Sequence, residues 1–131
     1  MTSIKKIKEE LKGVNRYEVV IYGSFVRKNS TSKSDIDVAV ISREKDRGKN
    51  RKLWYELLSK APYPYELKIF ELLSLPIQIE IINNYKVIFG DSLEISEYFY
   101  NFRRLWKDTE KRYCENQFHS VKEKMSILQR N

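Results

Sequence analysis

Hydrophobic and polar residues follow two periods along the first ninety residues, and these periods predict alternating strands and helices. Runs of β-branched and aromatic residues with a two-residue period predict four strands, over about 17–22, 36–41, 66–70 and 86–89. Apolar residues at helical spacing predict three helices, between a cap at Thr2 or Ser3 and Gly13, over 49–60, and from Pro76 to about 83. The buried stripe of the second is expected to consist of Leu53, Trp54, Leu57 and Leu58. This order predicts an α+β fold in which a small mixed β-sheet is flanked by helices.

A long helix is predicted over about 92–128, because this segment has helical periodicity and contains no Gly or Pro. Its first stripe is suited to packing on the domain and consists of Phe99, Phe102, Trp106, Thr109 and Tyr113. A second, slightly rotated stripe consists of Cys114, Phe118, Val121, Met125 and Leu128. Two interpretations of the second stripe stay open: it docks a partner chain or a second copy, or it folds back on the same domain.

Length and composition predict one compact domain over residues 1–131, with its core at about 15–90. The chain is 41% hydrophobic, which is enough to form a buried core. No apolar stretch approaches the roughly 18 residues needed to cross a bilayer, so no membrane segment is expected. The single cysteine, Cys114, cannot form an internal disulfide, and we expect a cytoplasmic protein.

Positive charge is concentrated in the first half of the chain. The net charge is +7, and residues 1–60 alone hold fifteen Lys and Arg against eight Asp and Glu. Much of this charge lies in the basic run 43–52. Such a run can steer an anionic ligand, bind nucleic acid or an acidic protein, or simply form a solvated face, and the sequence leaves these alternatives open.

The sequence Gly23-Ser24, followed after ten residues by Asp35-Ile36-Asp37, carries the chemistry. Strand side chains alternate between faces, so Asp35 and Asp37 are expected to point the same way. Two adjacent carboxylates repel each other unless a cation lies between them, and divalent metal ions are the usual solution. A Gly-Ser turn offers backbone N–H groups to a polyphosphate. The pattern indicates a nucleotide-handling site; the structural alternative is a capped turn with exposed aspartates.

The segments 22–27 and 34–40 together resemble the minimal nucleotidyltransferases (MNT) of the DNA polymerase β superfamily, and the resemblance covers about residues 15–90. It implies that Asp35 and Asp37 bind two Mg²⁺ ions, with ATP as the substrate. It also implies a nucleotide-binding segment that consists of Gly23, Ser24, Arg27 and Ser34. Arg27 stands at the family's basic position, and Ser34 is suited to capping the turn before Asp35. Lys28 departs from the glycine that is usual there.

A third carboxylate is expected on a neighbouring strand, where it would share a metal and act as, or orient, the base. Alignment on the apolar rhythm places Lys68 where the family tends to have this acid. Glu66 shares a strand face with Lys68, while Glu71 follows the strand end. We predict Glu66 as the third catalytic and metal-binding residue, beside Asp35 and Asp37. Glu71, or no third acid at all, stays an alternative.

The resemblance also implies a biological role. Known MNT proteins are often paired with a separately encoded HEPN RNase toxin, which they neutralise by binding or by transferring AMP from ATP to a tyrosine. The prediction is therefore an Mg²⁺-dependent adenylyltransferase that acts as the antitoxin of a HEPN partner. One alternative is a degenerate antitoxin that only binds. The other is a transferase for a small molecule or an RNA end, although the length leaves no room for an acceptor domain. His119, without an acid–base partner at a suitable spacing, is interpreted as a surface residue.

Overall fold

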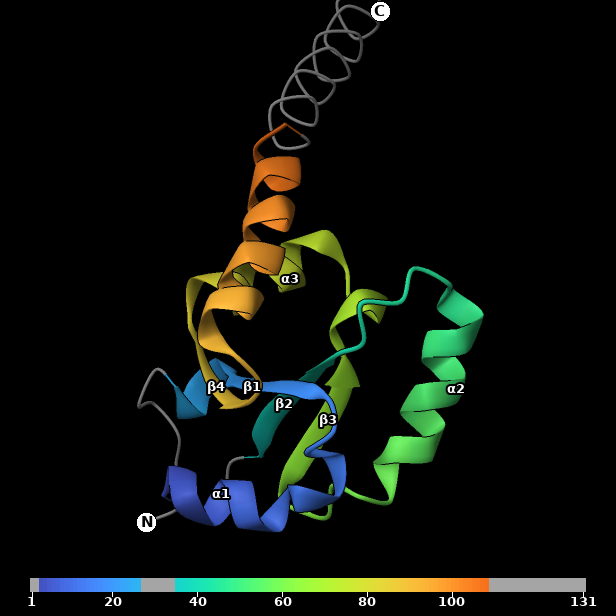
Figure 1. Cartoon of the computed structure of the whole chain (residues 1–131), viewed down its shortest axis with the longest axis vertical. Coiled ribbons are helices and arrows are strands. Elements are labelled where there is room, and N and C mark those ends of the chain that lie inside the picture. Colours follow the sequence, from blue (N-terminus) through green and yellow to red (C-terminus); the bar gives the residue numbers. More distant parts are fainter. Residues whose placement is uncertain (1–2, 27–34, 109–131) are drawn as a thin grey trace, which may run out of the picture.

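The computed structural model describes residues 3–26 and 35–108, and its centre is a four-stranded mixed sheet with the order β3-β2-β1-β4 (Figure 1). The strands are β1 (Glu18–Tyr22), β2 (Ile36–Ile41), β3 (Tyr65–Ile69) and β4 (Tyr85–Phe89). β1 runs antiparallel to both β2 and β4, whereas β2 and β3 are parallel. The predicted α+β class with a mixed sheet is confirmed, and each strand lies within one residue of its predicted bounds.

In the described residues one α-helix precedes the sheet, two connect its strands, and a fourth follows it. They are α1 (Ile4–Glu10), α2 (Arg47–Leu58), α3 (Leu75–Asn83) and a last helix that is described over residues 92–108. Ser3 caps α1 by accepting a hydrogen bond from the Lys6 backbone N–H at 3.2 Å. Asp46 caps α2 in the same way through the Lys49 N–H at 3.0 Å, so α2 begins two residues earlier than predicted.

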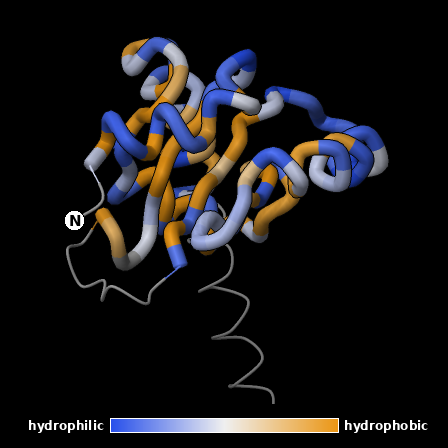
Figure 2. Tube along the Cα trace, turned by 90° about the horizontal axis from the view of Figure 1, so that it is seen from below, coloured by the Kyte–Doolittle hydropathy of each residue, from blue (hydrophilic) through white to orange (hydrophobic). Residues whose placement is uncertain are grey.

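The sheet separates two hydrophobic cores. Alternate residues of the strands, such as Val19, Val38 and Leu67, pack against α1 and α2. The residues between them, such as Val20 and Ala39, face α3 and the last helix. The segments at the centre of the molecule are accordingly rich in hydrophobic residues, as Figure 2 shows. Because both faces are covered along most of the sheet, charged residues on the strands are confined to the strand ends and to the edge strand β3.

The predicted buried stripe of α2 is correct except at its last member. Leu57 is buried, and Leu53 and Trp54 pack against the same core. Leu58 is 40% exposed, so the prediction that it is buried was wrong. Leu58 is the last residue of α2, rotated by about 100° from Leu57 and turned away from the sheet.

The last helix packs on the sheet through aromatic residues. Phe99 is buried, its ring centroid lies 4.9 Å from that of Phe70, and Phe102 meets Phe70 edge-on at 5.1 Å. Of the predicted first stripe, Phe99 is buried and Phe102 and Trp106 are partly buried. Thr109, Tyr113 and the whole second stripe lie outside the described residues. Within the described ranges, no helix is long and apolar enough to span a lipid bilayer.

Candidate active site

Gly23 allows the end of β1 to approach β2 closely. It has φ +78°, a conformation that favours glycine, and opens the short 3₁₀ helix η2 (Gly23–Phe25), which also contains Ser24. A Cβ atom at this position would overlap Asp37 Oδ2 and would lie 3.3 Å from Asp37 Cγ. The glycine is therefore required for contact between the turn and the carboxylate, as well as for its backbone conformation.

The two aspartates lie at the beginning of β2. Asp35 is the exposed residue before the strand, and Asp37 is the half-buried second residue of it. Ile36 and Val38, the neighbours of Asp37, face the α1/α2 core, so Asp37 lies on the opposite face of the sheet. Asp37 pairs with Tyr22 of β1 and with Glu66 of β3. Because β2 is a central strand, residues from both neighbouring strands converge on Asp37.

Glu66 and Lys68 complete a charged cluster on the edge strand β3. Glu66 is the direct cross-strand partner of Asp37, and Lys68 is the partner of Ala39, one pair further along. Residues two apart on a strand share a face, so both charged side chains lie beside the aspartates. Lys68 Nζ lies 3.6 Å from Glu66 Oε1, and both side chains are well exposed.

Electrostatics in this cluster favour a proton or another cation. The pKa of Asp37 is raised, first by partial burial and then by the negative charge of Glu66. Asp35 and a hydrogen bond with Glu66 raise it further, whereas the positive charge of Lys68 lowers it. Three carboxylates therefore act on one another here, and Lys68 offsets only part of their repulsion.

Tyr22 and Glu80 were missed by the sequence analysis. Tyr22 is 9% exposed, and its pKa is raised well above the usual range by burial and then by Asp37, Glu66 and Glu80. The phenol therefore stays neutral beside the carboxylates. Tyr22 could have been found from its position directly before Gly23. Glu80 could not, because α3 packing on the sheet brings it to the site and no local pattern marks it.

The donor chemistry of the cluster fits magnesium bound together with a nucleotide. Within residues 3–26 and 35–108, no group of three Asp, Glu, His or Cys side chains is arranged to hold a metal ion by itself. Magnesium prefers oxygen ligands, however, and is usually bound by one or two carboxylates plus substrate phosphates. Asp37 and Glu66, paired across two strands with Asp35 nearby, supply such oxygens.

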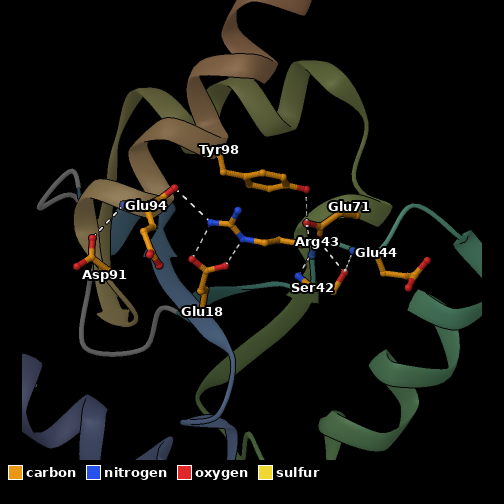
Figure 3. Close-up of polar contacts among 8 residues, drawn as sticks. All are labelled: Glu18, Ser42, Arg43, Glu44, Glu71, Asp91, Glu94 and Tyr98. Carbon is orange, nitrogen blue, oxygen red and sulfur yellow. Dashed lines mark hydrogen bonds and ion pairs between the residues drawn. The ribbon is translucent and has the colours of Figure 1, made fainter.

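Glu71 lies elsewhere, at the opposite end of the sheet (Figure 3). It belongs to the 3₁₀ helix η3 (Phe70–Leu72), and its carboxylate accepts four hydrogen bonds. The donors are Ser42 N at 3.0 Å, Ser42 Oγ at 3.1 Å, Arg43 N at 2.9 Å and Tyr98 Oη at 2.7 Å. Glu71 thus ties the end of β2 to the last helix and does not meet Asp37.

Arg43 extends this second cluster. Its Nε and one terminal nitrogen donate to the two carboxylate oxygens of Glu18 at 2.6 and 3.0 Å, and the guanidinium lies 4.6 Å from the Tyr98 ring centroid. Arg43 has φ +60°, a strained conformation for a residue with a side chain. A cavity of about 510 Å³ opens beside it, between the segment after β2 and the last helix, away from the aspartates. Arg27 and Ser34 lie outside the described residues, and Ser24 is placed only through its backbone.

The fold and the site define a nucleotidyltransferase, and sequence comparison agrees. The family described as "Polymerase beta, Nucleotidyltransferase" matches residues 5–94, so the chain belongs to this family. A Methanocaldococcus jannaschii protein named "Putative protein adenylyltransferase" is 46% identical over 114 residues, which cover 87% of this chain and 88% of that protein.

Solved structures share the fold at low sequence identity. A toxin–antitoxin complex with AMP-PNP contains a chain that matches with a TM-score of 0.63 and 15% identity, over 80% of this chain and 90% of that one. A complex of tri-AMPylated Shewanella oneidensis HEPN toxin with MNT antitoxin matches with a TM-score of 0.59 and 14% identity, over 84% and 92%. A third is an MntA–toxin complex in which two aspartates, two positions apart, are replaced by glutamates; its TM-score is 0.61 at 15% identity, over 85% and 92%. At such identities the likeness shows the fold.

Proposed function

We propose that this chain is an adenylyltransferase that moves AMP from ATP, with Mg²⁺, to a tyrosine hydroxyl of a HEPN RNase toxin and thereby acts as its antitoxin. The observation that carries the proposal is the register that sets Asp37 between Glu66 on β3 and the Gly23 turn after β1. This juxtaposition gathers carboxylates next to a turn that can receive phosphates.

Each site residue has a role in this reaction. Asp35, Asp37 and Glu66 would hold two magnesium ions, which when bound stabilise the charge on the attacking and leaving oxygens. The backbone of Gly23 and Ser24 approaches the β- and γ-phosphates. Glu66, the exposed acid of the edge strand β3, takes the proton of the acceptor hydroxyl. The hydroxyl oxygen then bonds to the α-phosphorus as the bond to the bridging oxygen breaks, and pyrophosphate leaves.

The identity of the nucleotide and of the partner is supported by the relatives. The relative that is 46% identical is named as a protein adenylyltransferase, and the fold is shared with antitoxins solved with a HEPN toxin or with AMP-PNP. In the MntA variant, the two replaced aspartates are two positions apart, which is also the spacing of Asp35 and Asp37. We expect the last helix to provide the surface that docks the partner.

The experiment is a label-transfer assay with α-labelled ATP, Mg²⁺ and the HEPN-type protein encoded beside this chain. Wild type is expected to label the partner, and Asp35→Asn and Asp37→Asn are expected to lose the label. Asp91→Asn is the matched control, because Asp91 caps the last helix through Glu94 N at 3.0 Å and asparagine caps equally well. An unlabelled partner, with wild type and Asp37→Asn behaving alike, would reject the transferase function.

A second candidate function is an antitoxin that binds its partner without catalysis. It is favoured by one observation, the ion pair at 3.6 Å through which Lys68 engages the third acid, Glu66. Calorimetry distinguishes the two functions. Tight binding of the partner with no heat on adding Mg²⁺ and ATP supports the binding-only antitoxin, whereas nucleotide binding that Asp37→Asn abolishes supports the transferase.

A further inference from the structure

Lys68 lies among the acids of the site, although no role follows for it from the carboxylate chemistry. It occupies β3 two residues after Glu66 and faces the same side of the sheet as Asp37. Its cross-strand partner Ala39 carries only a methyl group, so no bulky side chain stands directly opposite the lysine on β2. Glu66, and not Lys68, is the residue opposite Asp37. Lys68 is therefore an added cation and does not replace the acid that the strand register supplies.

The acids that act on one another at this site come from three elements. Asp35 and Asp37 lie at the start of β2, Glu66 lies on β3, and Glu80 on α3 acts on the neutral phenol of Tyr22 beside Asp37. ATP would add further negative charge to this surplus of acids. Any fixed positive charge on this face therefore has a large effect on whether a polyphosphate can bind.

The ion pair between Lys68 and Glu66 is loose enough to exchange partners. At 3.6 Å the two atoms are in contact as charges but beyond a good charge-assisted hydrogen bond, which is about 2.7–2.9 Å long. The Lys68 side chain is 39% exposed, and an exposed pair of this kind contributes little to stability. A lysine on a flexible four-carbon stem can turn from the carboxylate to an arriving phosphate oxygen at small cost.

We propose that Lys68 is a nucleotide-binding residue whose ammonium group contacts the polyphosphate, so that ATP binds measurably even without a divalent metal. This inference rests on the proposed function, since it concerns the same site. Lysine binds phosphate as a point charge with three donors, and it needs no particular geometry to do so. Lys68 thus shares with the metal the task of neutralising the site.

The test measures ATP affinity by calorimetry, first in EDTA and then in saturating Mg²⁺. In EDTA, Lys68→Met is expected to weaken ATP binding about tenfold, and Lys68→Arg to stay within about threefold of wild type. The loss should be smaller with Mg²⁺, and Lys68→Met should need more Mg²⁺ to reach half-saturation of the nucleotide complex. Lys86→Met is the control, because Lys86 is an exposed lysine on β4, at the other edge of the same sheet.

Two outcomes would overturn this role of Lys68 while leaving the proposed function intact. One is equal metal-free affinity of wild type and Lys68→Met; the other is wild type that binds ATP with Mg²⁺ but not in EDTA. Absence of ATP binding by wild type under both conditions would instead refute the proposed function as well. Circular dichroism melts confirm folding of each variant, and Lys68→Arg retains the charge if Lys68→Met folds poorly.

Discussion

The two ends of the sheet carry the same kinds of residue in opposite electrostatic states. At the end that begins β2, Asp37 shares a crowded face with Glu66 and Asp35, and its pKa is raised. At the end that finishes β2, Glu71 accepts four hydrogen bonds, and Glu18 is held by both nitrogens of a bidentate arginine contact. At one end carboxylates repel one another, and at the other they accept hydrogen bonds from several donors.

This difference separates function from structure without reference to any motif. A carboxylate with all its hydrogen bonds made fixes the backbone around it and has no capacity left for a ligand. A carboxylate that lies among other carboxylates costs stability in the free protein and gains it when a cation arrives. The acids at the start of β2 are therefore expected to bind ligands. The acids at its end are expected to stabilise the fold, so that their mutation changes stability and not ligand binding.

The largest expected effect comes from removing an acid at the crowded end. Asp37→Asn should lower AMP transfer on the order of 1,000-fold, which is about 4 kcal/mol of transition-state stabilisation, because the amide cannot bind the metal as a carboxylate does. The measurement is single-turnover label transfer at saturating ATP. Transfer within tenfold of wild type would contradict the assignment of the crowded end as the active site.

The next largest effect is on stability, at the saturated end. Glu71→Gln presents an amide N–H₂ to donors such as Arg43 N and Tyr98 Oη, and should lower the free energy of unfolding by about 2 kcal/mol. Urea denaturation measures this loss. ATP affinity per folded molecule should stay unchanged. A Glu71→Gln variant that is fully stable but unable to bind ATP would show that this end of the sheet serves ligand binding and not stability.

A moderate effect is expected at Gly23. Gly23→Ala combines an unfavourable positive φ with a collision against the Asp37 carboxylate, and should cost about 1–2 kcal/mol of stability. Placing it in the Asp37→Ala background removes the collision and leaves only the backbone strain. The cost of Gly23→Ala should therefore be smaller in the double variant, as measured by a double-mutant cycle of unfolding free energies. An equal cost in both backgrounds would show that the turn and the acid are independent.

The smallest effect concerns pH. The pKa of Asp37 is higher in the native state than in the unfolded state, so the native state binds the proton more tightly. The stability of the protein therefore falls as the pH rises from the unfolded pKa to the native pKa of this residue. Asp37→Asn should therefore melt slightly above wild type at pH 7, and this difference should shrink as pH falls towards about 4, the ordinary aspartate pKa. Thermal melts across this pH range, without metal, measure the trend. If the stability advantage of Asp37→Asn over wild type grew as the pH fell, this prediction would be contradicted.

The sequence predicted the sheet because local rules determine it. Two-residue alternation locates β2 and predicts that Asp35 and Asp37 share a face. The structure places Asp35 just before the strand, where its charge acts on Asp37. The sequence left Glu66 and Glu71 as alternatives for the third acid. The parallel register sets Glu66 opposite Asp37 on β2, and its catalytic role stays a prediction. Arg43 could not be anticipated at all. Its positive φ and its contact with Glu18 are set by tertiary packing. No local residue pattern predicts an arginine in the left-handed backbone conformation.

The edge position of β3 has a consequence for strand addition by other chains. An outer strand presents unpaired backbone groups to which another chain can add, and proteins commonly prevent this with charge or by covering the edge. On β3 the Trp54 indole donates to the Leu67 carbonyl at 2.8 Å, and the exposed Glu66 and Lys68 place opposite charges along the rest of the strand. The residues that we expect to handle the nucleotide thus also protect the open side of the sheet against strand addition, and apolar replacements there would expose the chain to aggregation.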